Sequence, residues 1–223
     1  MNIKHKNTSL ATLAGLTTCA IALLLTAGCA SSGNEKGNKT AASIQAAANN
    51  IAALPTEIGK TLASLSDLVN QPAADLRPQY KAFVFNLAVV EDAGREVEDA
   101  RIDLGQQGKA YFAEWDAQLA KIKNEDIKAR SQSRKNEVTQ QLQAIKQSYA
   151  EAEVVYRPFM SGLKDVQKYL SVDLTLDGVA AIKGTLNKAL TDVGPLNASL
   201  AKLANDFKAL GVAMSSVAPA PAK

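Results

Sequence analysis

The chain has 223 residues, with 25 Lys and Arg against 22 Asp and Glu and a formal net charge of +3. This near balance gives no general electrostatic case for binding nucleic acid, which depends on a clearly basic surface. The chain contains one histidine, His5, and two cysteines, Cys19 and Cys29. Few catalytic triads or zinc sites can be built from so few of these residues.

The first 28 residues have the layout of a secretory signal. Lys4 and Lys6 precede an apolar stretch from about Leu10 to Leu25, and small residues follow it. A membrane-spanning helix needs about 20 mostly apolar residues. Because this stretch is shorter, the pattern favours a signal that is cleaved over a permanent span.

The residues that end this signal, Thr26-Ala27-Gly28-Cys29, resemble the lipobox of bacterial lipoproteins. The resemblance implies cleavage between Gly28 and Cys29 and acylation of Cys29, with palmitate as the lipid to test for. The pattern departs at Thr26, where a leucine is usual. An ordinary signal cleaved nearby, which would leave Cys29 as a free thiol, is the alternative.

The residue after Cys29 is Ala30 rather than Asp. By resemblance to the sorting rule of enteric bacteria, Ala30 implies an outer-membrane lipoprotein that faces the periplasm. Two or three acyl chains hold a protein firmly, because each buried CH₂ contributes about 0.8 kcal/mol. We therefore expect a protein of the bacterial cell envelope, attached to the membrane through its lipid.

Cleavage of the signal would also change the residue inventory. It would remove Lys4, Lys6, His5 and Cys19 but no acidic residue, leaving 23 basic and 22 acidic residues. The remaining chain would have no histidine and one lipid-modified cysteine, which excludes internal disulfides, His–Cys zinc sites and Ser-His-Asp or Cys-His catalysis. We expect no catalytic residue, metal, cofactor or nucleic-acid partner.

Composition divides the chain into four parts: a signal over 1–28, a flexible tether over 29–40, a helical domain over 41–214 and a Pro/Ala-rich tail over 215–223. The tether is small, polar and glycine-bearing. The tail has no residues with which to bury itself.

Apolar residues recur at alternating steps of three and four along the domain, which predicts helices and no strands. Helices are expected over 41–70, about 76–123, 126–170, and from Thr175 or Asp177 to about 210. Breaks or bends are expected at Pro55 with Gly59, at Pro158, and at Gly194 with Pro195. The fold class is therefore all-α, an elongated antiparallel bundle built on a long coiled-coil hairpin with two shorter flanking helices.

The two long helices can be paired about a turn at Asn124–Glu125, so that facing residues have numbers that add to about 249. Apolar layers then form from Phe83 with Val166, Val90 with Phe159, Val97 with Ala152, Leu104 with Ile145, and Tyr111 with Val138. In this register Trp115 would face Arg134 in a cation–π contact. The tip would extend past the shorter helices by about 18 residues, or about 27 Å, on the side of the lipid anchor.

Several segments of the domain carry a family resemblance. They are YFAEWDAQL at 111–119, Arg130 with Ser133–Arg134, YRPFMSGLKDVQKYL at 156–170 and DLTLDGVAAI at 173–182. Together they resemble, over about 75–180, an uncharacterised family of bacterial coiled-coil proteins catalogued as a domain of unknown function. The motifs consist of aromatic, proline and leucine positions, so the resemblance implies a fold and no activity or site.

Acidic residues cluster in the first long helix, where Asp92, Glu96, Asp99 and Asp103 share one face. Such a face could hold a metal or the acid and base of a glycosidase, but helical di-iron sites also use histidine. Neighbouring arginines can pair with these carboxylates, so we expect a solvated, partly paired face.

Two further groups lie on the apolar stripe of this helix. Tyr111, Phe112 and Trp115 could stack a ligand, but their helical spacing favours packing in the core. Gly94 and Gly108 each cost about 1 kcal/mol relative to alanine, and close approach of the helices is the expected compensation.

The turn between the two long helices is basic. Six cations lie near it, Lys121, Lys123, Lys128, Arg130, Arg134 and Lys135, against Glu125 and Asp126. They could contact anionic phospholipid head groups, an acidic protein or peptidoglycan, or keep an exposed turn soluble.

Taken together, these patterns favour a lipid-anchored, periplasm-facing envelope protein that acts as a non-catalytic helical scaffold or interaction module, with a protein partner in the envelope. A membrane-surface-binding protein that uses the basic tip is the second hypothesis. A carboxylate-based hydrolase is the third, because long bundles rarely enclose a substrate pocket.

Overall fold

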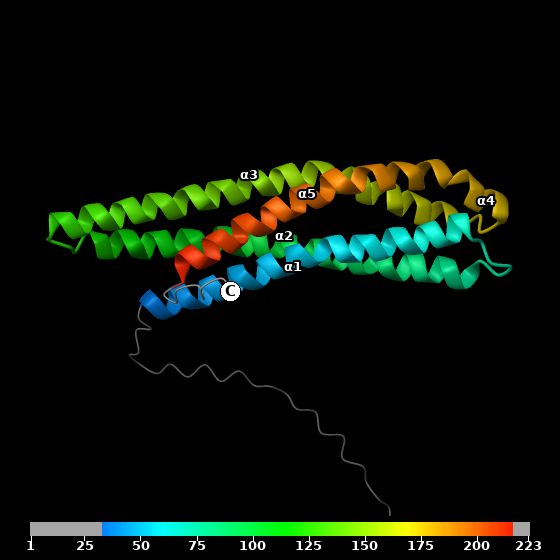
Figure 1. Ribbon diagram of the computed structural model, residues 1–223. Helices are drawn as coiled ribbons and strands as arrows, with labels where there is room; N and C mark the ends of the chain where they lie inside the picture. Colours follow the sequence, from blue (N-terminus) through cyan, green and yellow to red (C-terminus); the bar gives the residue numbers. More distant parts are fainter. Residues whose placement is uncertain (1–32, 216–223) are drawn as a thin grey trace, which may run out of the picture. The chain divides into compact units, whose positions relative to one another are not determined.

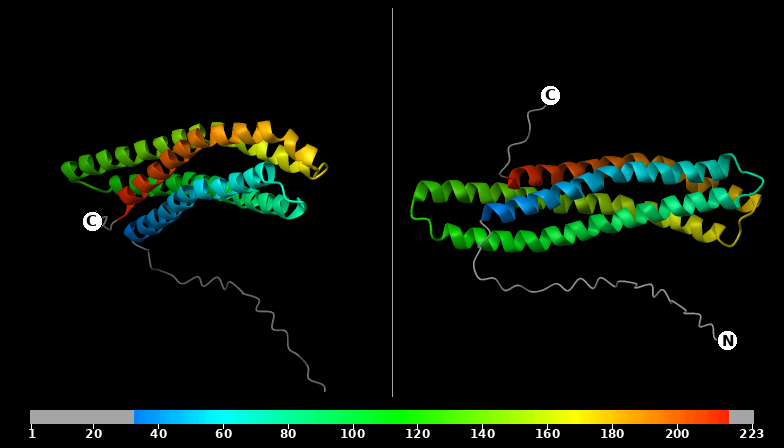
Figure 2. Two further views of the ribbon diagram at one scale, coloured as in Figure 1. Left: turned by 45° about the vertical axis from the view of Figure 1, so that its right-hand side comes forward. Right: turned by 90° about the horizontal axis from the view of Figure 1, so that it is seen from below.

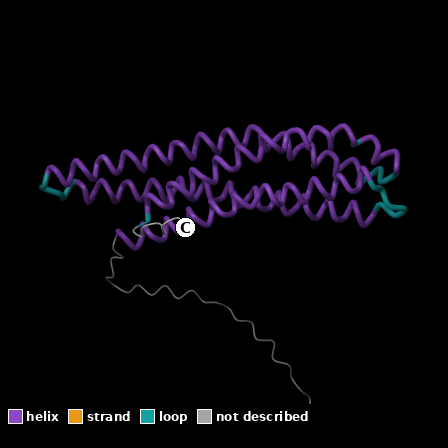
Figure 3. Tube along the Cα trace, in the orientation of Figure 1, coloured by secondary structure: helices purple, strands orange, loops and turns teal. Residues whose placement is uncertain are grey.

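The structure, a computed structural model, describes residues 33–215, and over this range it contains helices joined by short turns (Figures 1 and 3). The helices are α1 (Gly33–Asn70), α2 (Arg77–Leu119), α3 (Glu125–Leu170), α4 (Leu176–Ala181) and α5 (Lys183–Met214). The described part is therefore an all-α bundle of four long helices and one short helix, as the apolar periodicity predicts.

The first helix, α1, differs from its prediction at two places. It begins at Gly33, inside the segment predicted as a tether, and it continues without a break through Pro55. Small residues at its start lie close to the end of α5, where a side chain on Gly37 would meet the Met214 carbonyl at 3.7 Å. Buried residues around Pro55, such as Leu54 and Ile58, keep the helix in place, because tertiary packing outweighs local helix preference.

The hairpin of α2 and α3 has clear boundaries. Pro78 lies in the first turn of α2, where its missing N–H is not needed. The side chain of Asn124 caps α3 by accepting a hydrogen bond from the Ile127 N–H at 3.1 Å, and Glu125 and Asp126 in the first turn complement the helix dipole. The turn therefore lies at 120–124, next to its predicted position.

Contacts between α2 and α3 confirm the predicted register. The Tyr80 hydroxyl donates to the Gln167 carbonyl at 3.0 Å, and the Trp115 indole N–H donates to the Ser131 hydroxyl at 2.8 Å. The residue numbers of these pairs add to 247 and 246, close to the predicted 249. The predicted contact between Trp115 and Arg134 is replaced by this hydrogen bond, and Arg134 instead pairs with Glu137 at 2.8 Å.

The four long helices do not pack equally closely. The first helix packs most closely against α5 and α2, and α5 also packs against α3, whereas α2 and α3 approach each other less closely. Two views show this arrangement, with α1 and α5 beside each other along the hairpin (Figure 2). The α2–α3 side, called the seam below, is therefore closed by long side chains rather than by close backbone approach.

The short α4 begins where the sequence predicts, because the Thr175 side chain accepts a hydrogen bond from the Gly178 N–H at 3.0 Å. The following α5 is continuous through Pro195 and curves along its length (Figure 2). The third helix is likewise continuous through Pro158.

Three prolines in different helices lie near one another along the length of the bundle. Asn50 bonds to Glu96 across α1 and α2, a pair whose numbers add to 146, which places Pro55 opposite Glu91. The register of the hairpin, in which facing residue numbers add to 246 or 247, places Pro158 opposite Ala88 or Val89, two or three residues from Glu91. Between α3 and α5, the facing residue numbers add to 353 for Lys202 with Glu151 and to 347 for Arg134 with Ala213, which places Pro195 opposite residues 152–158 of α3. Each proline removes one helical hydrogen bond, so all three losses fall within about two helical turns of one another along the bundle.

The hairpin tip and the start of α1 lie at the same end of the bundle (Figure 1). Arg134 donates a hydrogen bond to the Ala213 carbonyl at the end of α5, so the uncovered tip begins near Arg134. This residue follows Glu125 by nine positions, which corresponds to about 14 Å of helix. The overhang is therefore shorter than the predicted 27 Å, because α5 continues to Met214. Among the described helices, none has the length and apolar content needed to cross a membrane.

Candidate functional sites

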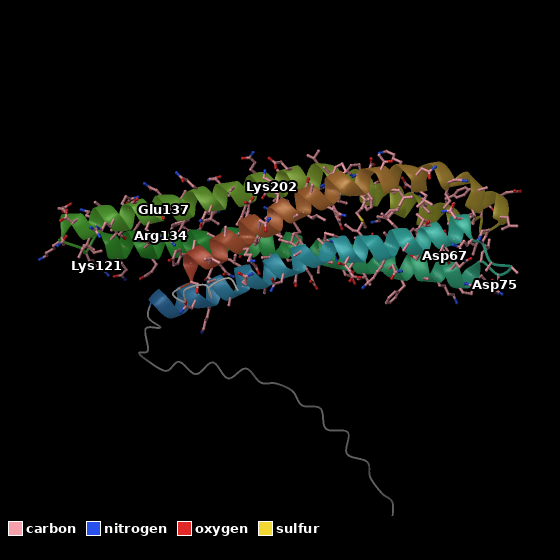
Figure 4. All side chains as sticks on the ribbon, in the orientation of Figure 1. Asp67, Asp75, Lys121, Arg134, Glu137 and Lys202 are labelled. Atoms are coloured by element: carbon pink, nitrogen blue, oxygen red, sulfur yellow. The ribbon has the colours of Figure 1, made fainter. Side chains whose placement is uncertain are left out.

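The six cations near the hairpin tip fall into two groups. Lys121 and Lys123 lie just past α2, Lys128 and Arg130 lie on the first turns of α3, and the side chains of Lys123 and Arg130 are exposed. Figure 4 shows Lys121 at the tip. Weak contacts hold two of these lysines, because Lys121 lies 3.4 Å from Gln118 and Lys128 lies 3.8 Å from Glu125. These four cations form the outer tip.

The other two cations of this set, Arg134 and Lys135, form bonds to other parts of the bundle. Arg134 bonds to Glu137 on its own helix and to the Ala213 carbonyl of α5. Lys135 pairs with Asp116 across the hairpin, and its ammonium lies 5.8 Å above the Phe112 ring. The interaction surface predicted from sequence is therefore smaller than the six cations suggest.

The aromatic group near the tip is a packed cluster. Tyr111 and Trp115 meet edge to face, with ring centroids 5.4 Å apart, and Phe112 and Trp115 lie 6.5 Å apart in a stacked arrangement. All three side chains are half-buried. They fill the hairpin near the end of α5, which fits the predicted packing role.

The predicted acidic face is partly paired. Asp92 pairs with Arg95, and Glu96 accepts a hydrogen bond from the Asn50 side chain at 3.3 Å. Within residues 33–215, no group of three His, Cys, Asp or Glu residues is placed to hold a metal ion. Gly28 and Cys29, the predicted cleavage and lipidation positions, lie outside the described residues, as does the tail after Ser215.

A cleft of about 460 Å³ lies along the seam, at the level of the three prolines. Its floor consists of buried apolar residues from all four long helices, namely Leu54, Val97, Ala152, Met160, Leu200 and Leu203. Tyr149 and Tyr156 also line it, and charged residues of α2 and α3 form its rim. No pattern in the sequence predicts this cleft.

One wall of the cleft depends on Gly94. The Tyr156 hydroxyl donates to the Val90 carbonyl at 3.2 Å, and a Cβ on Gly94 would lie 2.9 Å from the Tyr156 ring carbon Cζ. Gly94 was expected to let the helices approach closely, but it makes room for this tyrosine instead. Burial raises the pKa of Tyr156 to about 12, so the hydroxyl stays protonated at neutral pH.

At the other end of the cleft, Glu98 bonds to two partners. The Arg101 guanidinium donates to both Glu98 oxygens, at 2.6 and 3.0 Å, and the Tyr149 hydroxyl also donates to Glu98. The Arg101 guanidinium also lies 4.9 Å above the Tyr149 ring. The bonds from Arg101 and Tyr149 lower the pKa of Glu98 to about 2, and burial with the bond to Glu98 raises the pKa of Tyr149 to about 12. Both groups therefore keep one charge state near neutral pH.

The rim of the cleft carries ion pairs. Lys164 of α3 pairs with Glu91 of α2 at 2.8 Å, which links the two helices across the seam. Arg157 pairs with Glu153 one turn away on α3. The sequence does contain one signal for this site, because the predicted register already places Gly94 opposite Tyr156.

Comparisons with known proteins identify the chain at family level. The family model described as "Protein of unknown function (DUF2959)" matches residues 27–209. This match extends well beyond the 75–180 resemblance seen in the sequence and includes the alanine-rich α1. Comparisons with curated proteins and with solved structures gave no match. Because the family model covers most of the chain, the protein belongs to the DUF2959 family of proteins of unknown function.

Proposed function

We propose that the protein is a lipid-anchored, periplasm-facing protein of the bacterial envelope that acts as a non-catalytic helical scaffold. The observation that carries this proposal is the position of the hairpin tip at the same end of the bundle as the start of α1, which begins at Gly33. Gly33 follows the candidate lipidation residue Cys29 by four positions, a span of at most about 14 Å. The anchor and the basic tip would then act together at one membrane surface.

The ionisable groups at the cleft support a non-catalytic role. General acids and bases work best with a pKa near the working pH, whereas the pKa of Glu98 is near 2 and that of Tyr149 is near 12. Partner proteins would be recognised by helix-to-helix contact along exposed faces or through the outer tip.

Metabolic labelling with palmitate in a bacterial host tests the anchor. Cys29→Ser should abolish labelling, and Cys19→Ser should leave it unchanged, because Cys19 lies within the predicted signal. Labelling that persists in Cys29→Ser would contradict the anchor. Crosslinking in intact cells, followed by mass spectrometry, should then recover envelope proteins as partners of the scaffold.

Binding to the membrane surface through the outer tip is the second candidate. The segment 121–135 has six cations against two acids, and the apolar side chain of Ile127 in the same segment is 54% exposed. Cations near an anionic membrane contribute about 1 kcal/mol each. This candidate differs from the scaffold because it needs no protein partner.

Vesicle flotation separates the two candidates. The full chain carrying Cys29→Ser should bind vesicles that contain phosphatidylglycerol, less at high salt, and the added changes Lys123→Glu and Arg130→Glu should remove this binding. Lys81→Glu with Lys168→Glu, an equal charge change toward the other end of the hairpin, should retain it. If both double substitutions reduced vesicle binding equally, a specific role for the tip would be excluded.

A further inference from the structure

The cleft along the seam has the size and composition of a small-molecule site. Its volume of about 460 Å³ lies within the roughly 300–1,000 Å³ of typical ligand pockets, which are mainly apolar with a few polar groups. Its lining extends along α3 from Tyr149 to Lys164, about 22 Å of helix. The site is therefore elongated, and it suits an extended ligand better than a compact one.

The walls offer aromatic rings rather than free hydroxyl groups. The Tyr156 hydroxyl already donates to the Val90 carbonyl, and the Tyr149 hydroxyl already donates to Glu98. A hydroxyl has a single proton to donate, so neither tyrosine has a donor left for a ligand. Together with the buried apolar floor, these rings favour a hydrocarbon chain.

The rim determines which head group the chain would carry. In two rim pairs the cation belongs to α3 and is the more exposed member, with the Arg157 side chain 76% and the Lys164 side chain 59% exposed. Their carboxylate partners are less exposed, with Glu153 at 33% and Glu91 at 28%. An anionic head group arriving from solvent would meet the cations first. A cationic head group would meet Arg157 and Lys164 before it reached the less exposed Glu153 and Glu91.

We propose that this cleft binds a single-chain amphiphile with an anionic head group, of the fatty-acid class. The chain lies along the floor between α2 and α3, and the carboxylate binds Arg157 and Lys164. Each cation has several N–H donors, so it can donate hydrogen bonds to the ligand carboxylate and keep its bond to Glu153 or Glu91. This binding site does not depend on the lipid anchor or on the outer tip.

Photo-crosslinking tests the site on the full chain. A dodecanoic acid that carries a diazirine in its chain should label peptides that contain residues 91–98 or 149–164, as mapped by mass spectrometry. Excess dodecanoate should remove the label. Dodecyltrimethylammonium, which has the same chain with a cationic head group, should compete at least about tenfold less well. Equal competition by the two amphiphiles, or label confined to other segments, would overturn the proposal.

Two variants test the head-group contact. Arg157→Gln with Lys164→Gln should weaken dodecanoate binding about tenfold or more, because hydrogen bonds to charged groups are stronger than neutral ones. Lys60→Gln with Lys188→Gln is the matched control, since these two lysines pair with Glu57 and Asp192 away from the cleft. Unchanged affinity in the Arg157 and Lys164 double variant, with the helical circular dichroism signal intact, would also overturn the proposal.

Discussion

Gly94 and Tyr156 act together across the seam. The hydroxyl of Tyr156 reaches the Val90 carbonyl only because Gly94 has no side chain. A glycine inside a helix costs about 1 kcal/mol relative to alanine, and this local cost is offset by the buried tyrosine and its hydrogen bond. The sequence identifies Gly94 as unusual, but the side chain that needs it becomes visible only in the structure.

Gly94→Ala should therefore destabilise the protein. Displacing Tyr156 costs about 1–2 kcal/mol after the gain in helix preference is subtracted. Gly105→Ala, where the added Cβ meets nothing within 4 Å, should stabilise by about 0.5–1 kcal/mol. Urea unfolding measures both changes. The cost of Gly94→Ala should shrink in a Tyr156→Phe background, and opposite results for the two glycines would contradict this account.

Glu98 gives the protein a defined pH dependence. Its pKa is lowered from 4.5 to about 2 by Arg101 and Tyr149, so the carboxylate stabilises the fold above about pH 4.5, and this contribution is lost as the pH falls toward 2. The Glu98 side chain is 39% exposed, and solvent screening limits the contribution to about 1 kcal/mol.

Glu98→Gln should accordingly destabilise the protein by about 1 kcal/mol at pH 7, and the difference from wild type should shrink as the pH falls to 2.5. Urea unfolding at several pH values tests this prediction. Glu114→Gln is the control, because Glu114 bonds only to Gln118 on its own helix. A difference for Glu98→Gln that is the same at both pH values would contradict the assignment.

At the level of the helices, the sequence predicts those features of the fold that follow from the repeated spacing of apolar residues. The hairpin, its turn and its register follow from two apolar stripes that match each other layer by layer. The early start of α1 does not follow, because Gly37 and the nearby alanines give little apolar signal and pack only because α5 reaches Met214. The break at Pro55 is predicted from the proline alone, because proline has no backbone N–H to donate. The helix is nevertheless continuous, because the residues around Pro55 are buried against other helices.

The cleft could not be predicted for a related reason. Its existence depends on α2 and α3 standing further apart than the other neighbouring helices. Apolar periodicity indicates which residues face a partner helix, but it does not give the distance between the helices. Tyr149 and Tyr156 flank the stripe in the sequence, and only their orientation in the structure makes them walls of a cleft.

Asn124 should be a measurable determinant of the hairpin turn. Its side chain satisfies the Ile127 N–H at the start of α3, and replacing such a cap with alanine costs about 1 kcal/mol. We expect Asn124→Ala to lower the free energy of unfolding by this amount in urea. Asn136→Ala, an exposed change inside α3, should have little effect, and an equal loss for both would argue against the cap.

At the scale of the whole bundle, stability should be uneven. The first helix, α1, packs closely against α5 and α2, whereas only long side chains join α2 to α3 along the seam. Beyond Arg134 the tip consists of α2 and α3 alone. Amide hydrogen exchange should therefore be slowest in the middle of α1 and α5 and fastest in the tip around Asn124. Uniform protection along the hairpin would contradict this order.

Pro55, Pro158 and Pro195 leave the middle of the bundle with three fewer helical hydrogen bonds, and we expect any bending of the bundle to concentrate at this level. From Glu91, at that level, to Leu119, at the end of α2, there are 28 residues, or about 42 Å of lever arm. A change of about 20° at the prolines would swing the far end of this arm by about 15 Å. The cleft lies close to these prolines, and we expect a small bend there to become a large movement of the cationic turn at the hairpin tip.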